Sequence, residues 1–365
     1  MKKTKILFFL AGLHGGGAQR VAMTILRKLD KKRFDITLVL VIKSGDYVDM
    51  IPKNINVIDL NLKKTIFSHF KIRKIIQELQ PNIVFSTLFR THNIIYLSLL
   101  GIKKKPLVVL RSQNSPKLVL ENNQLGILAK FLLEKAYNNA DMIVAQTPEM
   151  KSEIIKYHNI DGNKIEVFLN PIDTELIEKK INEIENPFDN NRINIVAAGR
   201  LTWQKGFDIL VQSFKYIIDK DNNYFLHIIG NDDGEKENIQ QMIYDLSLEN
   251  NIKLWGFQKN PYKFFYYADL FVLSSRWEGL PNAVLENLYL KKPVVVTKCI
   301  PFMEQLVKEN KNGKLVDVED PIQLAHAILD YKSIELNFSN TFNDRDINDL
   351  FLSIGTRVTY DSVSL

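Results

Sequence analysis

Cysteine is nearly absent from this sequence, which contains only Cys299 among its 365 residues. A single cysteine excludes an internal disulfide and gives no support to a cysteine-ligated metal site, so a reducing cytoplasm is the expected compartment. Long apolar runs are missing too, because the longest candidate, residues 94–102, is well short of the roughly twenty residues that a transmembrane helix requires. Basic residues are not interleaved with aromatic ones in any recognised motif, so we expect no nucleic-acid partner.

The composition that remains is that of an ordinary globular protein, with 45% hydrophobic and 25% charged residues. A chain of 365 residues can bury a sizeable core and is expected to form two domains. The net charge is +6, and basic residues cluster in the amino-terminal half at Lys63-Lys64, Lys71, Arg73, Lys74 and 103–105. Because each basic residue near an anionic leaflet contributes about 1 kcal/mol, these clusters could hold the protein at a membrane, although a solvated surface explains them equally well.

Short apolar runs separated by helix-compatible segments recur along the chain, which is typical of parallel α/β sheets. The run at residues 6–13 resembles the core of a signal peptide, but it leads into a glycine-rich turn and an amphipathic helix at 18–29, so we interpret it as a first buried strand. The predicted strands are 5–11, 34–42, 57–60, 83–86, 107–110, 142–145 and 165–168, followed by 193–198, 224–230, 252–254, 270–274, 294–297 and 314–316.

This pattern predicts an α/β fold with two Rossmann-like, doubly wound domains that face a central cleft, where ligands bind preferentially. The expected boundaries are residues 1–173 for the amino-terminal domain, 174–192 for a polar connection and 193–335 for the carboxyl-terminal domain. Residues 336–365 would form a divergent tail, with weak helical periodicity at 346–354 and without a long final helix packed against the first domain.

Two glutamates, Glu278 and Glu286, stand where the strand predicted at 270–274 turns into a helix predicted at 281–290. Such a turn directs backbone N–H groups and the positive end of a helix dipole at a ligand, which suits phosphates and hydroxyl-rich molecules. Glu286 lies among apolar residues, and a buried carboxylate needs hydrogen-bond donors such as the two hydroxyls of a ribose. A lone helical glutamate is more often a surface residue, so the pairing of two at one turn is what favours a sugar nucleotide.

A second loop of this kind follows the strand predicted at 193–198 and carries two cations, Arg200 and Lys205. The planar guanidinium of Arg200 and the compact ammonium of Lys205 could together neutralise a diphosphate leaving group. Either residue alone would be interpreted as a solvated loop residue. The two loops together therefore predict a site for an activated sugar.

Three consecutive glycines, Gly15, Gly16 and Gly17, precede the helix predicted at 18–29. Glycine lacks a Cβ atom, so this turn lets the backbone approach a ligand closely, and the helix that follows offers free N–H groups. The spacing does not match the dinucleotide-binding motif G-x-G-x-x-G, so a dehydrogenase is not expected.

These motifs resemble those of glycosyltransferase family 4, the retaining sugar-nucleotide enzymes of GT-B fold. The resemblance is carried first by Gly199-Arg200-Leu201 with Lys205-Gly206, and then by Glu278-Gly279-Leu280-Pro281 with Glu286. Other matches extend over most of the chain, at residues 15–20, 170–173 and 268–272.

The resemblance implies transfer of a hexosyl or N-acetylhexosaminyl group, with retention at the anomeric carbon, from a nucleotide-diphosphate sugar. A UDP-sugar donor and a glycan or polyprenyl-linked acceptor are the preferred pair, in bacterial surface polysaccharide or glycan assembly. No metal or other cofactor is expected, because the nucleotide sugar is a substrate. The enzyme would act in the cytoplasm, at the cytoplasmic face of the inner membrane.

The resemblance also implies roles for individual residues. Glu278, Arg200 and Lys205 would be catalytic, with Glu278 positioning sugar hydroxyls and the two cations assisting departure of the diphosphate. The amino-terminal domain would present the acceptor. Contacts to the donor would come from Arg200 and Lys205 and from Gly16, Gly17, Gly279, Leu280, Pro281, Asn282 and Glu286.

One departure from the family lies after the fifth predicted strand, where relatives often carry a histidine near the reacting sugar and this sequence has none. Arg111, Ser112 and Asn114 occupy that stretch and are candidates for the acceptor or sugar contact. The nearest histidines by loop position are His92 and His14, although a lone histidine is more often a packing or surface residue.

Two alternatives share these motifs. A sugar-nucleotide epimerase of GT-B fold would need acid and base residues in the cleft and no acceptor. A non-catalytic nucleotide-sugar-binding subunit would keep Arg200, Lys205 and Glu286 yet give no turnover. Release of nucleoside diphosphate that depends on added acceptor separates transfer from both alternatives.

Overall fold

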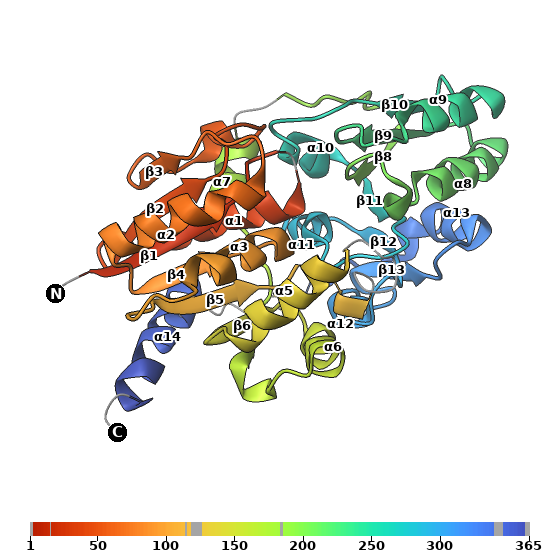
Figure 1. Ribbon diagram of the computed structural model, residues 1–365. Helices are drawn as coiled ribbons and strands as arrows, with labels where there is room; N and C mark the ends of the chain where they lie inside the picture. Colours follow the sequence, from red (N-terminus) through yellow and green to blue (C-terminus); the bar gives the residue numbers. More distant parts are fainter. Residues whose placement is uncertain are drawn as a thin grey trace. The chain divides into compact units, whose positions relative to one another are not determined.

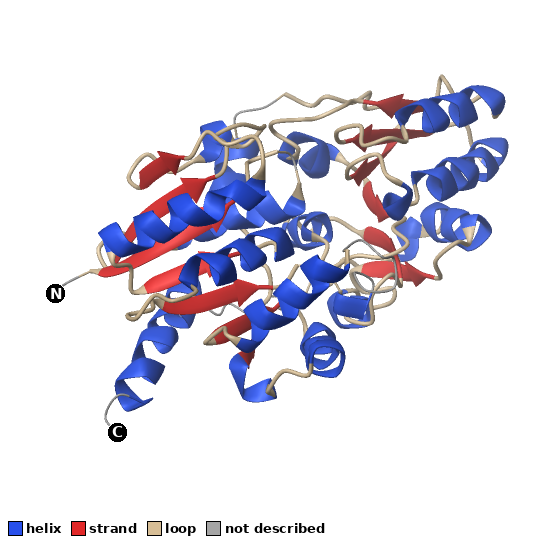
Figure 2. Ribbon diagram, viewed as in Figure 1, coloured by secondary structure: helices blue, strands red, loops and turns tan. Residues whose placement is uncertain are grey.

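A computed structural model describes residues 3–14, 16–113, 115–117, 126–182, 185–338 and 346–361. The chain divides into two compact units, the first formed by Met1–Pro171 with Asn343–Leu365 and the second by Ile172–Phe342. Each unit contains one sheet of parallel strands with helices packed against it (Figures 1 and 2). Among the described residues, no helix combines the length and the apolar character needed to cross a bilayer.

The first unit contains a seven-stranded sheet in the order β3-β2-β1-β4-β5-β6-β7. Its strands are β1 (Thr4–Leu10), β2 (Phe34–Leu40), β3 (Asn56–Asp59), β4 (Ile83–Ser86), β5 (Leu107–Arg111), β6 (Met142–Ala145) and β7 (Ile165–Val167). The helical segments are α1 (Gly17–Lys28), η1 (Val48–Met50), η2 (Thr65–Phe67), α2 (Ser68–Leu79), α3 (Phe89–Leu99), α5 (Ile127–Asn138), α6 (Pro148–His158), η3 (Gly162–Lys164) and α14 (Ile347–Asp361).

Apolar side chains cover both faces of this sheet, as expected for buried parallel strands. Along β1, Leu7 and Phe9 face one core cluster and Ile6 and Phe8 face the other, because successive strand residues point to opposite faces. Helices α2, α3, α5 and α6 pack against the first cluster, and α1 and α14 pack against the second. The doubly wound architecture predicted from the sequence is therefore confirmed for this unit.

The second unit contains a six-stranded parallel sheet in the order β10-β9-β8-β11-β12-β13. The strands are β8 (Ile193–Ala198), β9 (Tyr224–Ile229), β10 (Ile252–Leu254), β11 (Leu270–Leu273), β12 (Val294–Thr297) and β13 (Gly313–Val316). The helical segments are α7 (Thr174–Ile181), η4 (Trp203–Lys205), α8 (Phe207–Lys220), α9 (Lys236–Asp245), α10 (Tyr262–Tyr267), α11 (Asn282–Tyr289), α12 (Met303–Leu306), α13 (Pro321–Leu329) and η5 (Tyr331–Ser333). Each predicted strand is present in one of the two sheets.

The carboxyl-terminal segment corrects one expectation. The sequence suggested that no long final helix would pack against the first domain, but α14 lies against the first unit (Figure 1) and contacts α1. Four apolar residues at helical spacing, Ile347, Leu350, Phe351 and Ile354, are buried in the same core cluster as β1 and α1. The prediction was wrong because a single short apolar stripe does not show where along the chain its packing partner lies.

Candidate active site

The two loops that carry the predicted site lie side by side at one edge of the second sheet. Strands β8 and β11 are adjacent and parallel, with Phe271 opposite Val196, so their carboxyl ends meet at the same edge. Ligands of open α/β sheets bind at this edge. The loop that contains Arg200 and Lys205 follows β8, and the loop that contains Glu278 follows β11.

Lys205 and Glu278 form an ion pair at this edge. The Lys205 Nζ atom lies 2.5 Å from Glu278 Oε1, and both side chains are largely buried. Ser275 Oγ donates a second hydrogen bond to the same Glu278 oxygen at 2.7 Å. Two charges far apart in the sequence are thus held together in a partly dry environment, where an ion pair is stronger than on the surface.

Arg200 lies in the same loop but pairs elsewhere. Its Nη1 atom is 2.5 Å from Asp233 Oδ2, and both side chains are about half exposed. An exposed ion pair contributes little to stability, so the guanidinium can exchange Asp233 for a ligand anion at low cost. The structure therefore brings Arg200 to the predicted edge but, unlike Lys205, not into contact with Glu278.

Helix α11 follows the Glu278 loop. Pro281 is its N-cap residue, and the helix begins at Asn282, one residue later than the prediction of Pro281 as the first helical position. Glu286 is buried within this helix, as its apolar surroundings in the sequence suggested. Gly279 and Leu280 form the turn between Glu278 and the helix, and Leu280 is buried. The helix carries no acidic residue in its first turn, so its N-terminus keeps a positive potential.

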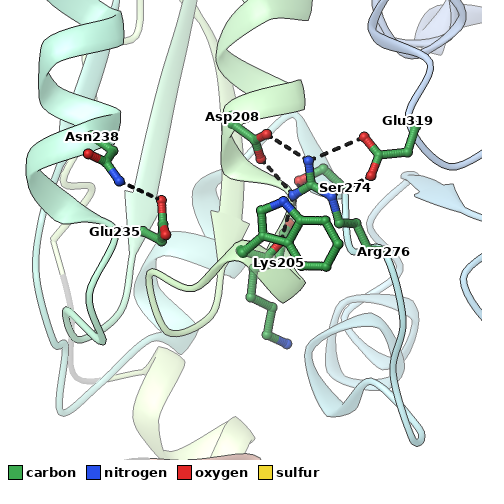
Figure 3. Close-up of polar contacts among 8 residues, drawn as sticks. Lys205, Asp208, Glu235, Asn238, Ser274, Arg276 and Glu319 are labelled. Atoms are coloured by element: carbon green, nitrogen blue, oxygen red, sulfur yellow. Dashed lines mark hydrogen bonds and ion pairs between the residues drawn. The ribbon is translucent and has the colours of Figure 1, made fainter. Parts of the chain in front are cut away.

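Arg276, whose side chain is only 7% exposed and which no sequence motif marked, fixes the two loops to each other. Arg276 donates to both carboxylate oxygens of Asp208, at 2.8 and 2.7 Å, and pairs with Glu319 at 2.5 Å (Figure 3). Its guanidinium also lies over the Trp203 ring, 4.4 Å from the ring centroid. The hydrogen bonds that Arg276 donates to Asp208, and then to Glu319, raise the pKa of Arg276 above its usual range. The only sequence signal was an arginine in the loop before Glu278.

Backbone contacts complete this connection. The Arg276 N–H donates to the Gln204 carbonyl oxygen at 2.8 Å, and Ser274 Oγ donates to the Lys205 carbonyl oxygen at 2.9 Å. Gly206 has a positive φ of 61°, and a Cβ atom there would lie 2.2 Å from the Ser274 carbonyl oxygen. The glycine in the Lys205-Gly206 motif is therefore required so that the two loops can approach this closely.

We expect Arg276→Met to lower the free energy of unfolding by about 2 kcal/mol. Loss of a fully buried ion pair would lower it further, but the Glu319 side chain is about half exposed. We expect kcat to fall as well, because the loop that carries Lys205 loses its anchor. Chemical denaturation and initial rates measure the two effects. The matched control is Lys298→Met, which removes the exposed Lys298–Asp317 pair at 3.0 Å. If the two variants had the same free energy of unfolding and the same kcat, the role given to Arg276 would be contradicted.

The glycine turn of the first unit leads into α1. Gly16 is the N-cap residue of this helix and Gly17 is its first residue, whereas Gly15 lies outside the described residues. Gly16 has no side chain with which to cap this N-terminus, and the first turn of the helix carries no acidic residue. The helix start therefore keeps a positive potential, and binding of a donor phosphate by Gly16 and Gly17 stays a prediction.

The structure buries two of the three candidates for the acceptor or sugar contact, Arg111 and Ser112. The third candidate, Asn114, lies outside the described residues. Arg111 donates a hydrogen bond through Nη2 to Asn170 Oδ1, and burial lowers the pKa of Arg111 to about 9. The Tyr137 hydroxyl donates to Ser112 Oγ at 3.4 Å.

Neither histidine considered as an alternative lies in the stretch after β5. His92 is buried on α3, with Nδ1 2.7 Å from Ser86 Oγ, and burial lowers its pKa to about 3. It is therefore neutral at physiological pH. His14 is exposed, and its Nε2 atom lies 3.3 Å from Ser44 Oγ.

Comparison with known proteins agrees with this geometry. The family model "Glycosyltransferase Family 4" matches residues 15–176, and "Glycosyl transferases group 1" matches residues 178–345. The chain belongs to glycosyltransferase family 4. Its two parallel sheets are those of the GT-B fold, and the family assignment agrees with the resemblance found from the two loop motifs.

Three similar proteins illustrate this membership. An uncharacterized glycosyltransferase from Methanocaldococcus jannaschii is 35% identical over 253 residues, 65% of this chain and 60% of that protein, so less than two thirds of that relative is matched. The N-acetylgalactosamine-N,N'-diacetylbacillosaminyl-diphospho-undecaprenol 4-alpha-N-acetylgalactosaminyltransferase from Campylobacter jejuni is 27% identical over 329 residues, 87% of each chain. The crystal structure of Anabaena HepE in complex with UDP has a TM-score of 0.73 and 18% identity, covering 99% of this chain and 100% of that one, which shows the fold.

Proposed function

We propose that this family 4 glycosyltransferase moves a hexosyl or N-acetylhexosaminyl group from a UDP-sugar to a glycan or polyprenyl-linked acceptor, with retention at the anomeric carbon. The observation that carries the proposal is the Lys205–Glu278 pair beside α11. The similar HepE binds UDP, and the similar Campylobacter enzyme is named for a diphospho-undecaprenol acceptor. Both support this choice of donor and acceptor.

The charges of the second unit fit the demands of such a transfer. The reaction develops positive charge at the sugar ring and negative charge on a departing diphosphate, and fixed charges stabilise both. Lys205 and Arg200 supply the cations for the diphosphate. Glu278 accepts hydrogen bonds from sugar hydroxyls and steadies the ring, and buried Glu286 accepts hydrogen bonds from the ribose.

Ligand-induced stabilisation tests the donor assignment. A donor present at 100 times its dissociation constant raises the free energy of unfolding by about 2.7 kcal/mol. We expect UDP-sugars to raise the melting temperature more than GDP- or ADP-sugars do at equal concentration. We also expect release of UDP only when a lipid-linked or glycan acceptor is added. Rapid UDP-sugar conversion without any acceptor would contradict transfer and favour an epimerase.

We also propose that the first unit contacts an anionic membrane at the cytoplasmic face, through η2 and the start of α2. Ile66, Phe67 and Phe70 are exposed there, with Phe70 70% exposed, next to Lys63 and Lys64. Exposed aromatic residues beside basic ones suit a membrane interface, where the rings enter the headgroup region and the charges meet anionic lipids.

Other basic residues of the first unit are held by contacts within the protein, so the proposal does not depend on them. Lys71 donates to the Leu60 carbonyl oxygen at 2.9 Å, Arg73 donates to the Leu100 carbonyl oxygen, and Lys74 pairs with Glu78 at 3.7 Å. Residues 103–105 precede β5, at the amino ends of the parallel strands, whereas Lys63 and Lys64 follow β3, at the carboxyl ends. The basic residues that remain for a membrane are those beside the exposed aromatic rings.

Liposome sedimentation tests this contact. The protein is expected to sediment with anionic liposomes at low salt and not with zwitterionic ones. The double variant Phe67→Ser, Phe70→Ser should reduce the bound fraction several-fold. Tyr244→Ser is the matched control, because Tyr244 is an equally exposed aromatic residue on α9 of the second unit. Unchanged binding of the double variant would contradict the proposal.

A further inference from the structure

Arg111 presents an unusual electrostatic situation at the carboxyl end of β5. It is only 2% exposed, yet none of the ion pairs among the described residues includes it. Nη2 donates to the amide oxygen of Asn170, which is neutral. The Nε and Nη1 atoms are buried and donate to no acceptor among the described residues.

Such an arrangement is costly for a protein. A guanidinium removed from water loses several kcal/mol of hydration, and proteins normally offset this loss with a buried carboxylate and a full set of hydrogen bonds. The Arg111 side chain has one neutral acceptor for its three nitrogen atoms. Nε and Nη1 lie on different edges of the planar guanidinium, and the second hydrogen of Nη2 completes a pair of parallel donors with either of them. One such edge fits two oxygens of a phosphate or diphosphate.

A second unsatisfied group lies beside it. Ser86 of β4 pairs with Leu110 of β5, so Thr87 and Arg111 stand one residue beyond that pair on neighbouring strands. Phe85 and Val109, two residues earlier in each strand, belong to the same core cluster, and alternation therefore turns Thr87 and Arg111 toward that same face. Thr87 is 1% exposed and its Oγ1 atom has no hydrogen-bond partner among the described residues.

The surrounding backbone is held in place. Gln146, which follows β6, donates through Nε2 to the carbonyl oxygens of Ser112 and Gln113, at 3.1 and 3.0 Å. These contacts fix the chain that leaves β5 directly after Arg111. The guanidinium and the hydroxyl therefore stand at the ligand-binding edge of a rigid sheet, which is how binding groups are kept pre-organised.

We propose that Arg111 and Thr87 form an anion subsite in the first unit that binds a phosphate or diphosphate of the acceptor. This inference rests on the proposed function, in which the first unit receives the acceptor. The guanidinium donates two charge-assisted hydrogen bonds to the anion, and the Thr87 hydroxyl donates a third. Because the nitrogens are buried, the entering anion displaces the side chains that cover them.

The full-length protein with inorganic pyrophosphate as the probe tests the subsite. Without anions, Arg111→Met is expected to melt at or above the wild-type temperature, because it removes a buried charge for which the described residues provide no counter-ion. Pyrophosphate should then raise its melting temperature less than it does for the wild type, and Thr87→Val should lose part of the same response. Lys215→Met is the matched control, because Lys215 is a cation on the exposed surface of α8 outside both proposed sites, and it should keep the full wild-type response. A lower melting temperature of Arg111→Met in anion-free buffer would show a structural role and overturn the proposal.

Steady-state kinetics identifies the source of the phosphate. We expect Arg111→Met to raise KM for a diphosphate-linked acceptor at least tenfold and to leave KM for the donor unchanged. The acceptor KM of Arg111→Lys should be intermediate, because lysine keeps the charge but lacks the planar pair of guanidinium donors. A rise in donor KM alone would overturn the assignment to the acceptor. Stabilisation by UDP is measured in parallel. If UDP fails to stabilise the wild type, the proposed function fails. If UDP stabilises the wild type but Arg111→Met leaves the acceptor KM unchanged, only the anion subsite is overturned.

Discussion

Replacement of Lys205 by methionine is expected to lower kcat by something on the order of 10²-fold or more while the protein stays folded. Methionine keeps the apolar part of the side chain, which lies against Gly199, and removes only the charge. The lost ammonium stands 2.5 Å from Glu278 at the edge where the diphosphate is expected to depart. Initial rates with saturating donor and acceptor measure the effect.

A double-mutant cycle separates catalysis from simple disruption of the ion pair. Glu278→Gln alone is expected to lose a comparable factor, and the double variant should lose much less than the product of the two, because residues that act as a unit are not additive. Lys215→Met is the control, since Lys215 also pairs with a carboxylate at 2.5 Å, that of Asp219, but on the exposed surface of α8. Wild-type kcat in Lys205→Met would remove Lys205 from the mechanism.

Truncation of Phe351 to alanine is expected to lower the free energy of unfolding by about 3–5 kcal/mol, because it leaves a cavity in the core of the first unit. Phe351 is 1% exposed, and its ring centroid lies 5.3 Å from that of Phe85 and 6.1 Å from that of Phe34. Its ring therefore packs α14 directly against aromatic residues of β2 and β4.

Two spectroscopic probes locate this effect. All three tryptophans, Trp203, Trp255 and Trp277, belong to the second unit, so their fluorescence reports on that unit, whereas circular dichroism reports on both. Phe351→Ala should lower the denaturation midpoint seen by circular dichroism more than the midpoint seen by fluorescence. Leu352→Ala is the matched control, because Leu352 is the next residue of α14 and is exposed. If both variants unfold like the wild type, α14 does not stabilise the first unit.

The elements of the fold could be predicted from the sequence because they depend on local patterns. Several predicted strands, such as β4 at Ile83–Ser86 and β8 at Ile193–Ala198, have the predicted bounds, and others differ by one or two residues at an end. A buried parallel strand is a short apolar run bounded by turn residues, and this signal is complete within the strand itself. The adjacency of the Lys205 and Glu278 loops was also predictable, because family motifs marked both strand ends.

The contacts of the site could be predicted only in part. Arg200 and Lys205 looked equivalent in the sequence, but the structure pairs Lys205 with buried Glu278 and Arg200 with exposed Asp233. The Arg276 network was missed altogether, because its partners Asp208 and Glu319 come from other elements and follow no local spacing.

The sequence by itself determined the two parallel sheets and the family, because apolar periodicity and loop motifs are local properties of the chain. Tertiary structure alone decided which charges are buried together, that Arg111 has no counter-ion among the described residues, and that α14 returns to the first unit. These properties depend on distances between residues that are far apart in the sequence. The order of the strands and the packing of the helices fix those distances, and no local pattern of residues encodes them.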